Sequence, residues 1–144
     1  MIINFPEPGF RIKKEEGREY IFDALRKKWV ALTPEEWVRQ NFLQYLLQVK
    51  NYPASLIALE KEIKLGELKK RFDILVYDNN HKPWMMIECK AVEVKLDEKV
   101  LEQVLRYNIS VPVAFIVITN GERTYAWQRL TSGLEMLNDI PDKI

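Results

Sequence analysis

Hydrophobic and polar residues recur along this chain with periods that predict most of its secondary structure. The clearest helix begins at Thr33-Pro34-Glu35-Glu36, where threonine is a good N-cap, proline suits the first helical position and Glu36 completes a capping box. The helix then runs to about Lys50 and stops at Asn51-Tyr52-Pro53, because a residue before proline avoids helical angles. Apolar side chains form one stripe at helical spacing, made of Val38, Phe42, Tyr45, Leu46 and Val49.

The remainder of the chain alternates strand patterns with one further helix. Residues 78–82 form a turn cluster, which predicts a hairpin between the strands on either side. A second helix is expected over residues 97–108, with Val100, Val104 and Tyr107 on one face. The predicted strands cover residues 56–64, 72–77, 84–90, 113–118 (fully apolar, hence buried on both faces) and 123–128 (an edge strand after a turn at Asn120-Gly121).

The order of these elements indicates an α/β fold with a central mixed β-sheet flanked by helices. In sequence order we expect α-β-β-β-α-β-β, preceded by a polar hairpin over residues 10–21 that turns at Glu16-Gly17. No linker or internal repeat divides the chain, so residues 1–144 are predicted to form a single domain, with residues 1–30 as an N-terminal hairpin extension within it.

Composition narrows the classes of function. The 144 residues carry 22 cationic and 21 acidic side chains, and the net charge of +1 excludes a generally polycationic nucleic-acid coat while leaving room for a local basic patch. The longest apolar run, residues 113–118, is far too short for a membrane span, and the first residues lack the pattern of a signal peptide, so we expect a cytoplasmic protein without membrane contact. One cysteine excludes an internal disulfide, and one histidine excludes a two-histidine metal site. Any chemistry is therefore expected to depend on carboxylates and lysines.

Asp73, Glu88 and Lys90 are expected to meet on one face of the predicted hairpin. Side chains alternate along a strand, so Glu88 and Lys90 point to one face while Cys89 points to the other. The turn centres near residue 80 or 81, so the numbers of cross-strand partners add up to about 160 or 161, and Asp73 lies opposite residue 87 or 88. Paired Cα atoms are roughly 4.5–5.5 Å apart, which brings two carboxylates and one ammonium together.

Such a patch suits a hard divalent cation, because two neighbouring carboxylates repel each other and a cation between them removes that penalty. Mg²⁺ takes oxygen ligands and is typically held by one or two carboxylates plus a substrate phosphate. We expect Asp73 and Glu88 to bind Mg²⁺, with Mn²⁺ as a substitute, and the backbone carbonyl of Cys89 to be a third ligand. Lys90 is expected to orient or activate the attacking water and to counter charge on the phosphate. The implied reaction is metal-assisted hydrolysis of a phosphodiester.

The pattern Phe72-Asp73 … Glu88-Cys89-Lys90 resembles the PD-(D/E)XK nuclease superfamily. With residues 70–74 and 87–91, Tyr107-Asn108 and Thr119-Asn120-Gly121, nearly the whole chain is similar to small stand-alone proteins grouped with the N-terminal nuclease region of type I restriction enzyme R subunits. This resemblance implies a restriction-endonuclease-like fold and a Mg²⁺-dependent endonuclease acting on DNA. The sequence departs from the superfamily pattern in having Phe72, and not proline, before Asp73.

The resemblance also implies a glutamate on the first helix that faces the metal, a role for which Glu35 and Glu36 compete. At 100° per residue, Glu35 lies about 40° from the centre of the apolar stripe and Glu36 about 140° away. Because Glu36 is also the capping-box partner, we assign the site role to Glu35. Electrostatic stabilisation of the helix N-terminus is an equally simple role for Glu35.

A second implied motif is Gln103 and Tyr107, a Q-x-x-x-Y spacing on the helix after the E-x-K strand. The two residues share a helix face with Val100 and Val104, and a glutamine on a buried face needs a hydrogen-bond partner. The site carboxylates or a DNA phosphate would provide one. The alternative is that both residues belong to the edge of the core.

Two segments concentrate basic residues for DNA contacts. Residues 61–71 hold five basic and two acidic side chains, and residues 11–28 hold seven and four. Such clusters give sequence-independent, salt-sensitive affinity for phosphates. We assign DNA contacts to Lys69, Lys70 and Arg71, the last of which shares a strand face with Asp73.

Other functions are compatible with the same residues. Asp73, Glu88 and Lys90 can form a surface ion-pair cluster, in which case the chain is a non-catalytic nucleic-acid-binding module or a regulatory, partner-binding subunit. The chain has no G-x-x-x-x-G-K-[ST] motif, so a motor or specificity function would have to come from a separate chain. The resemblance also allows a homodimer that cuts two strands.

Overall fold

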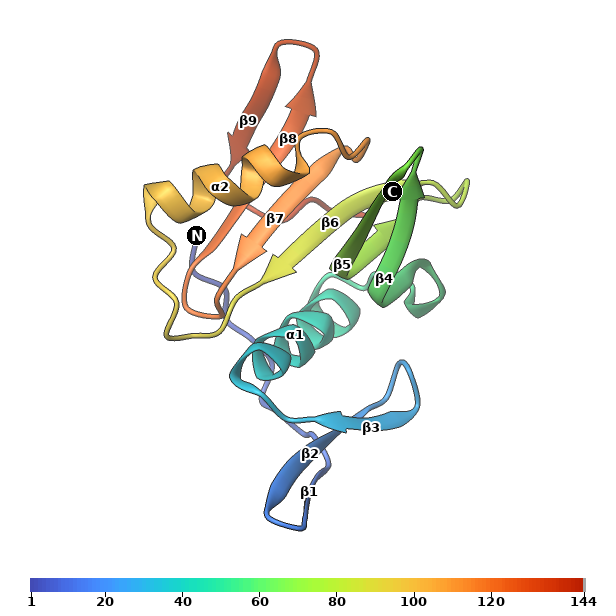
Figure 1. Cartoon of the computed structure of the whole chain (residues 1–144), viewed down its shortest axis with the longest axis vertical. Helices are drawn as coiled ribbons and strands as arrows, with labels where there is room; N and C mark the ends of the chain where they lie inside the picture. Colours follow the sequence, from blue (N-terminus) through green and yellow to red (C-terminus); the bar gives the residue numbers. More distant parts are fainter. Residues whose placement is uncertain (144) are drawn as a thin grey trace.

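The computed structural model describes residues 1–143 and shows an α/β chain with two helices and two separate β-sheets (Figure 1). Residue 144, the predicted end of the domain, lies outside the described residues. In chain order the elements are β1 (Ile12–Glu15), β2 (Arg18–Asp23), β3 (Lys28–Ala31), α1 (Pro34–Gln44), a π-helical turn η1 (Tyr45–Val49), a 3₁₀ turn η2 (Ala54–Leu56), β4 (Ile57–Leu65), β5 (Leu68–Tyr77), β6 (Pro83–Cys89), α2 (Glu98–Asn108), β7 (Phe115–Thr119), β8 (Thr124–Leu130) and β9 (Gly133–Leu137).

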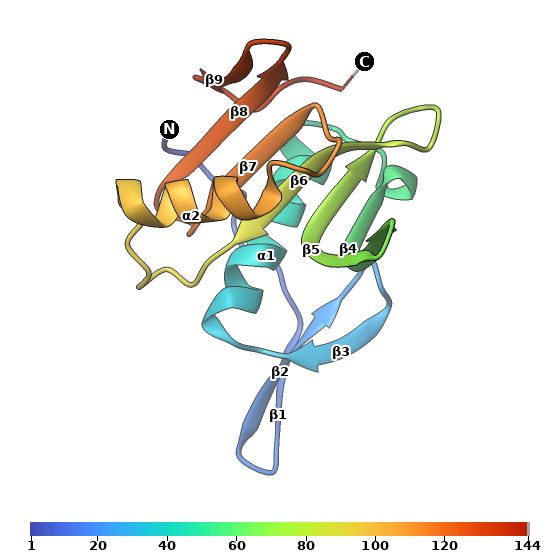
Figure 2. The same ribbon diagram turned by 45° about the horizontal axis from the view of Figure 1, so that its top comes forward.

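The larger sheet is mixed, as predicted, and has six strands in the order β4-β5-β6-β7-β8-β9. All neighbouring strands are antiparallel except β6 and β7, which are parallel because α2 crosses between them. The two helices cover opposite faces of this sheet (Figure 2). One core forms under α1 around Phe42 and Leu46, and the other forms under α2 around Leu75 and Ile116. None of the helices formed by residues 1–143 is long and apolar enough to cross a membrane.

Helix α1 begins as predicted. The Thr33 hydroxyl accepts a hydrogen bond from the Glu36 backbone N–H at 3.0 Å, and Pro34 occupies the first turn. The predicted apolar stripe faces the core as far as Leu46, which is fully buried, and the final turn continues as the π-helical η1. Val49 is the exception: it is 51 % exposed, because the wider π-helical turn carries it away from the stripe.

The β5–β6 hairpin has the register expected from its turn. Ile74 pairs with Ile87 and Leu75 with Met86, so partner numbers add up to 161, and the pairing shifts only near the turn, at Tyr77. Extending this register by one residue places Asp73 beside Glu88.

Two strands were missing from the predicted order. The N-terminal hairpin turns at Glu16-Gly17 as predicted, but β3 adds a third strand, so a boundary at residue 30 would cut this small sheet before its last residue, Ala31. The strand predicted over residues 123–128 is present as β8. Its predicted position at the edge of the sheet was wrong, because β9 pairs with β8 and forms the edge. Strand β7 is buried on both faces, as its apolar run predicted.

Candidate functional site

The three residues singled out from the sequence meet where β5 and β6 lie beside the start of α1. Asp73 of β5 accepts a hydrogen bond from the backbone N–H of Cys89 to its Oδ2 at 2.8 Å. Its Oδ1 accepts a second bond, from Arg39 Nη2 of α1, at 2.9 Å. The Asp73 side chain is 14 % exposed, so both bonds form in a largely desolvated position. Asp73 is therefore fixed against β6 on one side and α1 on the other.

Glu88 and Lys90 lie beside Asp73 as an ion pair, with 3.7 Å between Lys90 Nζ and Glu88 Oε1. The pKa of Glu88 is raised to about 7, first by burial and next by the negative charge of Asp73; Glu35 adds to this rise, and Lys90 opposes it. Lys90 thus offsets only part of the cost of placing the Glu88 carboxylate here. A carboxylate kept at such a pKa is typical of functional sites.

The raised pKa of Glu88 leads to a prediction for the stability of the metal-free protein. A carboxyl group whose pKa is higher in the folded than in the unfolded state contributes most below its unfolded pKa, and that contribution is lost as pH rises through the folded pKa. A rise from 4.5 to about 7 corresponds to about 3 kcal/mol for the charged form. With EDTA present, Glu88→Gln should therefore raise the free energy of unfolding by about 1–3 kcal/mol at pH 8 and change it little near pH 4.

Urea unfolding across this pH range measures the effect. Glu135→Gln, an exposed substitution on β9, is the matched control and should show no pH-dependent difference from the wild type. Equal stabilities of Glu88→Gln and the wild type at pH 8 would contradict the assignment of a buried, repelled carboxylate.

The two glutamates at the start of α1 differ in their surroundings. Burial raises the pKa of Glu35, and the next largest contribution comes from the charge of Asp73, so Glu35 lies close enough to the site to interact with it. Glu36 is buried and contacts the same Arg39 guanidinium as Glu35. Its carboxylate accepts hydrogen bonds from Arg39, Arg26 and Gln40, in place of the capping-box bond to the Thr33 backbone.

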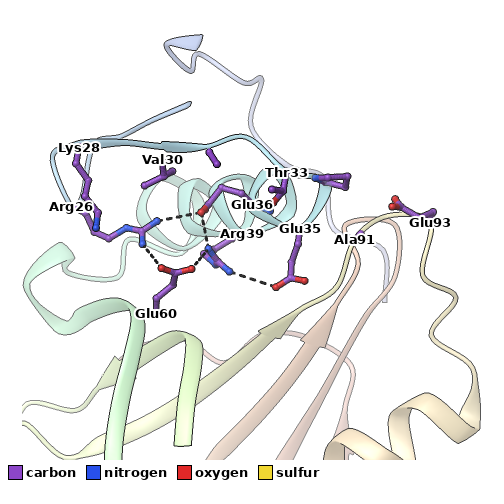
Figure 3. A pocket seen from close by; sticks show the side chains of 12 residues that line it. Arg26, Lys28, Val30, Thr33, Glu35, Glu36, Arg39, Glu60, Ala91 and Glu93 are labelled. Atoms are coloured by element: carbon purple, nitrogen blue, oxygen red, sulfur yellow. Dashed lines mark hydrogen bonds and ion pairs between the residues drawn. The ribbon is translucent and has the colours of Figure 1, made fainter. Parts of the chain in front are cut away.

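Arg39 is the residue of this site that the sequence did not reveal. Its side chain is 6 % exposed, and its guanidinium lies between Glu35 and Glu36 of α1 and Glu60 of β4 (Figure 3). Asp73 of β5 is its fourth carboxylate partner. From Arg39 Nη1 the distances are 2.7 Å to Glu36 and 3.0 Å to Glu60, and from Nη2 they are 2.9 Å to Asp73 and 3.6 Å to Glu35. The buried Nε has no hydrogen-bond partner among the described residues. Arg39 therefore connects the first helix with the strand that carries Asp73.

Glu60 extends this network to the turn between β2 and β3 and to β5. It accepts hydrogen bonds from Arg26 at 2.9 Å and from Arg71 at 3.2 Å, besides the bond from Arg39. Its φ of +49° lies in the left-handed region, where a residue other than glycine costs about 1–3 kcal/mol. The paired residues of β4 and β5 include the neighbours of Glu60 and Asp73 but not these two residues themselves. The regular strand pairing is therefore interrupted where the site begins. Altogether the connected network contains three arginines and five carboxylates: Arg26, Arg39, Arg71, Asp23, Glu35, Glu36, Glu60 and Asp73.

Gln103 and Tyr107 of α2 lie around the same cavity as Glu88 and Lys90. Together with Arg71, these four side chains line a cavity of about 430 Å³ between the sheet and α2. The expectation that Gln103 lies on a buried face was wrong, because α2 rests on Leu101, Leu105 and their neighbours and leaves Gln103 and Tyr107 exposed. Both are positioned to contact a bound molecule rather than the core.

The three predicted DNA-contact residues differ in their surroundings. Arg71 is exposed and borders the cavity, and Lys69 is exposed on the same strand face. Lys70 is only 5 % exposed, and its ammonium donates to the backbone carbonyl of Tyr107 and lies 4.2 Å from that ring. Lys70 attaches β5 to α2 and is not available to a phosphate, so the predicted DNA contact by Lys70 is wrong.

The donor set of this site fits a hard divalent cation. Each carboxylate oxygen has two lone pairs, so the bonds from Arg39 and Cys89 leave acceptor capacity on Asp73. The pKa of Glu88 is raised first by burial and next by repulsion from Asp73, and a bound cation would favour the charged carboxylate against both. Among residues 1–143 no group of three His, Cys, Asp or Glu side chains has the spacing of a metal site, so an ion would depend on two carboxylates, the predicted Cys89 carbonyl, water and substrate. The Cys89 thiol itself is fully buried, which raises its pKa and keeps it protonated.

Comparison with known proteins assigns a family to the chain. No curated protein matches the chain. A family model described as the type I restriction enzyme R protein N terminus matches residues 34–141, about three quarters of the sequence, and this range contains Glu35, Arg39, Asp73, Glu88 and Lys90. The chain therefore belongs to the family of the type I restriction enzyme R protein N terminus.

Proposed function

We propose that this protein is a Mg²⁺-dependent endonuclease of restriction-endonuclease-like fold and PD-(D/E)XK type that hydrolyses phosphodiester bonds in DNA. The observation that carries the proposal is the meeting of Asp73, Glu88 and Lys90 beside an open cavity, with Glu88 at a pKa of about 7. Membership in the type I restriction enzyme R protein N-terminal family supports the same substrate class. A separate motor or specificity chain and a second copy of this chain are the partners that this function suggests.

In this proposal each side chain has one task. Asp73 and Glu88 would hold the cation, with the Cys89 carbonyl and with Glu35 at its outer side. When bound, Mg²⁺ supplies Lewis-acid polarisation of the phosphodiester. Lys90 orients the attacking water and donates to a phosphate oxygen as negative charge develops there.

The residues around the cavity would place the substrate in line with that water. Arg71 neutralises a flanking phosphate. Gln103 and Tyr107 donate hydrogen bonds to the DNA backbone from the wall formed by α2. Lys69, exposed on the same strand as Arg71, contributes a weaker, salt-sensitive contact.

Two measurements test the proposal, one on the wild type and one on two variants. Supercoiled plasmid should be nicked with Mg²⁺ or Mn²⁺ and remain intact with EDTA. Mn²⁺ binding, followed by electron paramagnetic resonance, should be lost in Asp73→Asn and retained in Glu135→Gln, whose carboxylate lies on β9. Plasmid that stays intact with either metal would reject the nuclease.

A non-catalytic nucleic-acid-binding module is the second candidate. The observation that favours it is the double hydrogen bonding of Asp73, whose two oxygens already accept from Arg39 and Cys89. DNA binding that is equal with metal and with EDTA, together with an absence of nicking, would select this function.

A further inference from the structure

The small N-terminal sheet carries aromatic rings and cations together on one face. Tyr20 pairs across the strands with Lys13, and Phe22 pairs with Trp29. The Arg11 guanidinium lies 4.9 Å from the Phe22 ring and 5.3 Å from the Trp29 ring, and Lys13 Nζ lies 4.6 Å from the Trp29 ring. We call this surface the aromatic face; it comprises Arg11, Lys13, Tyr20, Phe22 and Trp29.

The rings of the aromatic face belong to neither hydrophobic core. Tyr20, Phe22 and Trp29 are half-buried, and Phe22 also borders a small cavity that Phe10 and Gln44 help to line. The residues that alternate with them on β2 are Ile21 and Asp23, both fully buried, and the Gln40 side chain of α1 donates to Asp23. The sheet therefore packs against the rest of the protein through the face that carries Ile21 and Asp23. Figure 1 shows this small sheet beyond α1, apart from the six-stranded sheet.

Positive charge is concentrated in the same segment. Residues 11–28 carry seven cationic and four acidic side chains, a net charge of +3, so the rest of the chain carries −2. Arg26 and Asp23 are paired inside the protein at 2.6 Å, which leaves six cations and three acidic residues toward solvent. The segment also precedes the region that the family model matches, which begins at residue 34. Polyanions are thus attracted to this sheet more than to the carboxylate-rich site beside it.

We propose that the aromatic face binds a single-stranded segment of nucleic acid, with bases stacked on Tyr20, Phe22 and Trp29 and phosphates bound by Arg11 and Lys13. Aromatic side chains on a sheet can stack only on unpaired bases, because a duplex hides the faces of its bases. The cations that now cover the rings make weak contacts at this exposed position, so an incoming base can displace them toward a phosphate.

The opposite face of the same sheet gives this binding a relation to the proposed nuclease site. Lys28 and Val30 of β3, which alternate with Trp29, line a cavity of about 690 Å³ together with Glu35 and Arg39 (Figure 3). A strand held on the aromatic face would therefore have to pass around the edge of this sheet to reach the carboxylates. This placement rests on the proposed function, and it selects DNA with unpaired segments as the substrate class.

Fluorescence anisotropy with a labelled oligothymidine of about 12 nucleotides, with EDTA present, tests the binding without any cleavage. Trp29→Leu and Tyr20→Leu should each weaken binding about 5–100-fold, the range for loss of one stacked base. Trp37→Leu, at a tryptophan of α1 that is 36 % exposed and lies outside the aromatic face, should bind like the wild type. Binding to a blunt duplex of the same length should change less than about 2-fold in all three variants. Quenching of tryptophan emission by the oligonucleotide should be largely lost in Trp29→Leu alone.

Equal affinity of the wild type, Trp29→Leu and Tyr20→Leu for the oligothymidine overturns the proposal. So does an equal loss of single-strand and duplex binding, which would indicate a purely electrostatic surface. Failure of the proposed nuclease appears differently, as intact plasmid in the presence of metal while these binding differences persist.

Discussion

Replacing Lys90 with methionine should slow metal-dependent plasmid cleavage by about 10²–10⁴-fold, the range that a positioned acid–base group contributes. Methionine keeps most of the side-chain volume and removes the ammonium that lies 3.7 Å from Glu88. Because this cation opposes the rise in the pKa of Glu88, its loss should raise that pKa further. Mn²⁺ binding by the variant should therefore persist but require a higher pH than in the wild type.

Two comparisons separate this role from a structural one. Lys95→Met removes an exposed lysine from the segment between β6 and α2 and should cleave at the wild-type rate. A rate of Lys90→Met that recovers fully when the pH is raised would assign Lys90 only to the ionisation of Glu88. A wild-type rate at all pH values would remove Lys90 from the site.

The part of this site that follows from short-range rules was predictable from the sequence. The turn residues 78–82 fix the register of one hairpin, and alternation along β6 separates Glu88 and Lys90 from Cys89. These two rules place Asp73 beside Glu88 without any knowledge of the rest of the fold. The capping signals at Thr33 likewise fix where α1 begins, and hence where Glu35 lies along it.

The remainder depends on contacts between distant segments. An arginine on a helix is normally expected at the surface. Arg39 is buried because Glu60 and Asp73 approach α1 from two strands and pair with it. Lys70 lies in a basic cluster and is buried because α2 packs over it. Strand alternation also fails around Asp73: Phe72 joins the core under α2, whereas Ile74 joins the core under α1. Neither strand propensity nor the spacing of apolar residues predicts that Phe72 and Ile74 lie on opposite faces of the sheet.

Arg39→Met is expected to lower the free energy of unfolding at pH 8 by about 3–5 kcal/mol, the range for removing one partner of a buried ion pair. The guanidinium interacts with Glu35, Glu36, Glu60 and Asp73 and is 6 % exposed, so methionine fills the space but leaves these carboxylates without their shared cation. Lys13→Met is the control, because the Lys13–Glu15 pair is solvent-exposed and should contribute less than about 1 kcal/mol. Urea unfolding with EDTA measures both variants. A loss below about 1 kcal/mol for Arg39→Met would show that Arg26 and Arg71 compensate the carboxylates by themselves.

The response of this variant to Mg²⁺ then connects stability with the proposed function. Removing Arg39 frees the Oδ1 atom of Asp73 and makes the site one charge more negative. A ligand that binds only the folded state stabilises it in proportion to its affinity, and a more negative site binds a cation more tightly. Added Mg²⁺ should therefore recover more stability in Arg39→Met than it adds to the wild type, and Asp73→Asn in the same background should abolish the recovery. If Mg²⁺ stabilises neither protein, the carboxylates serve Arg39 alone, and the buried network holds α1 against β4 and β5 without forming a metal site.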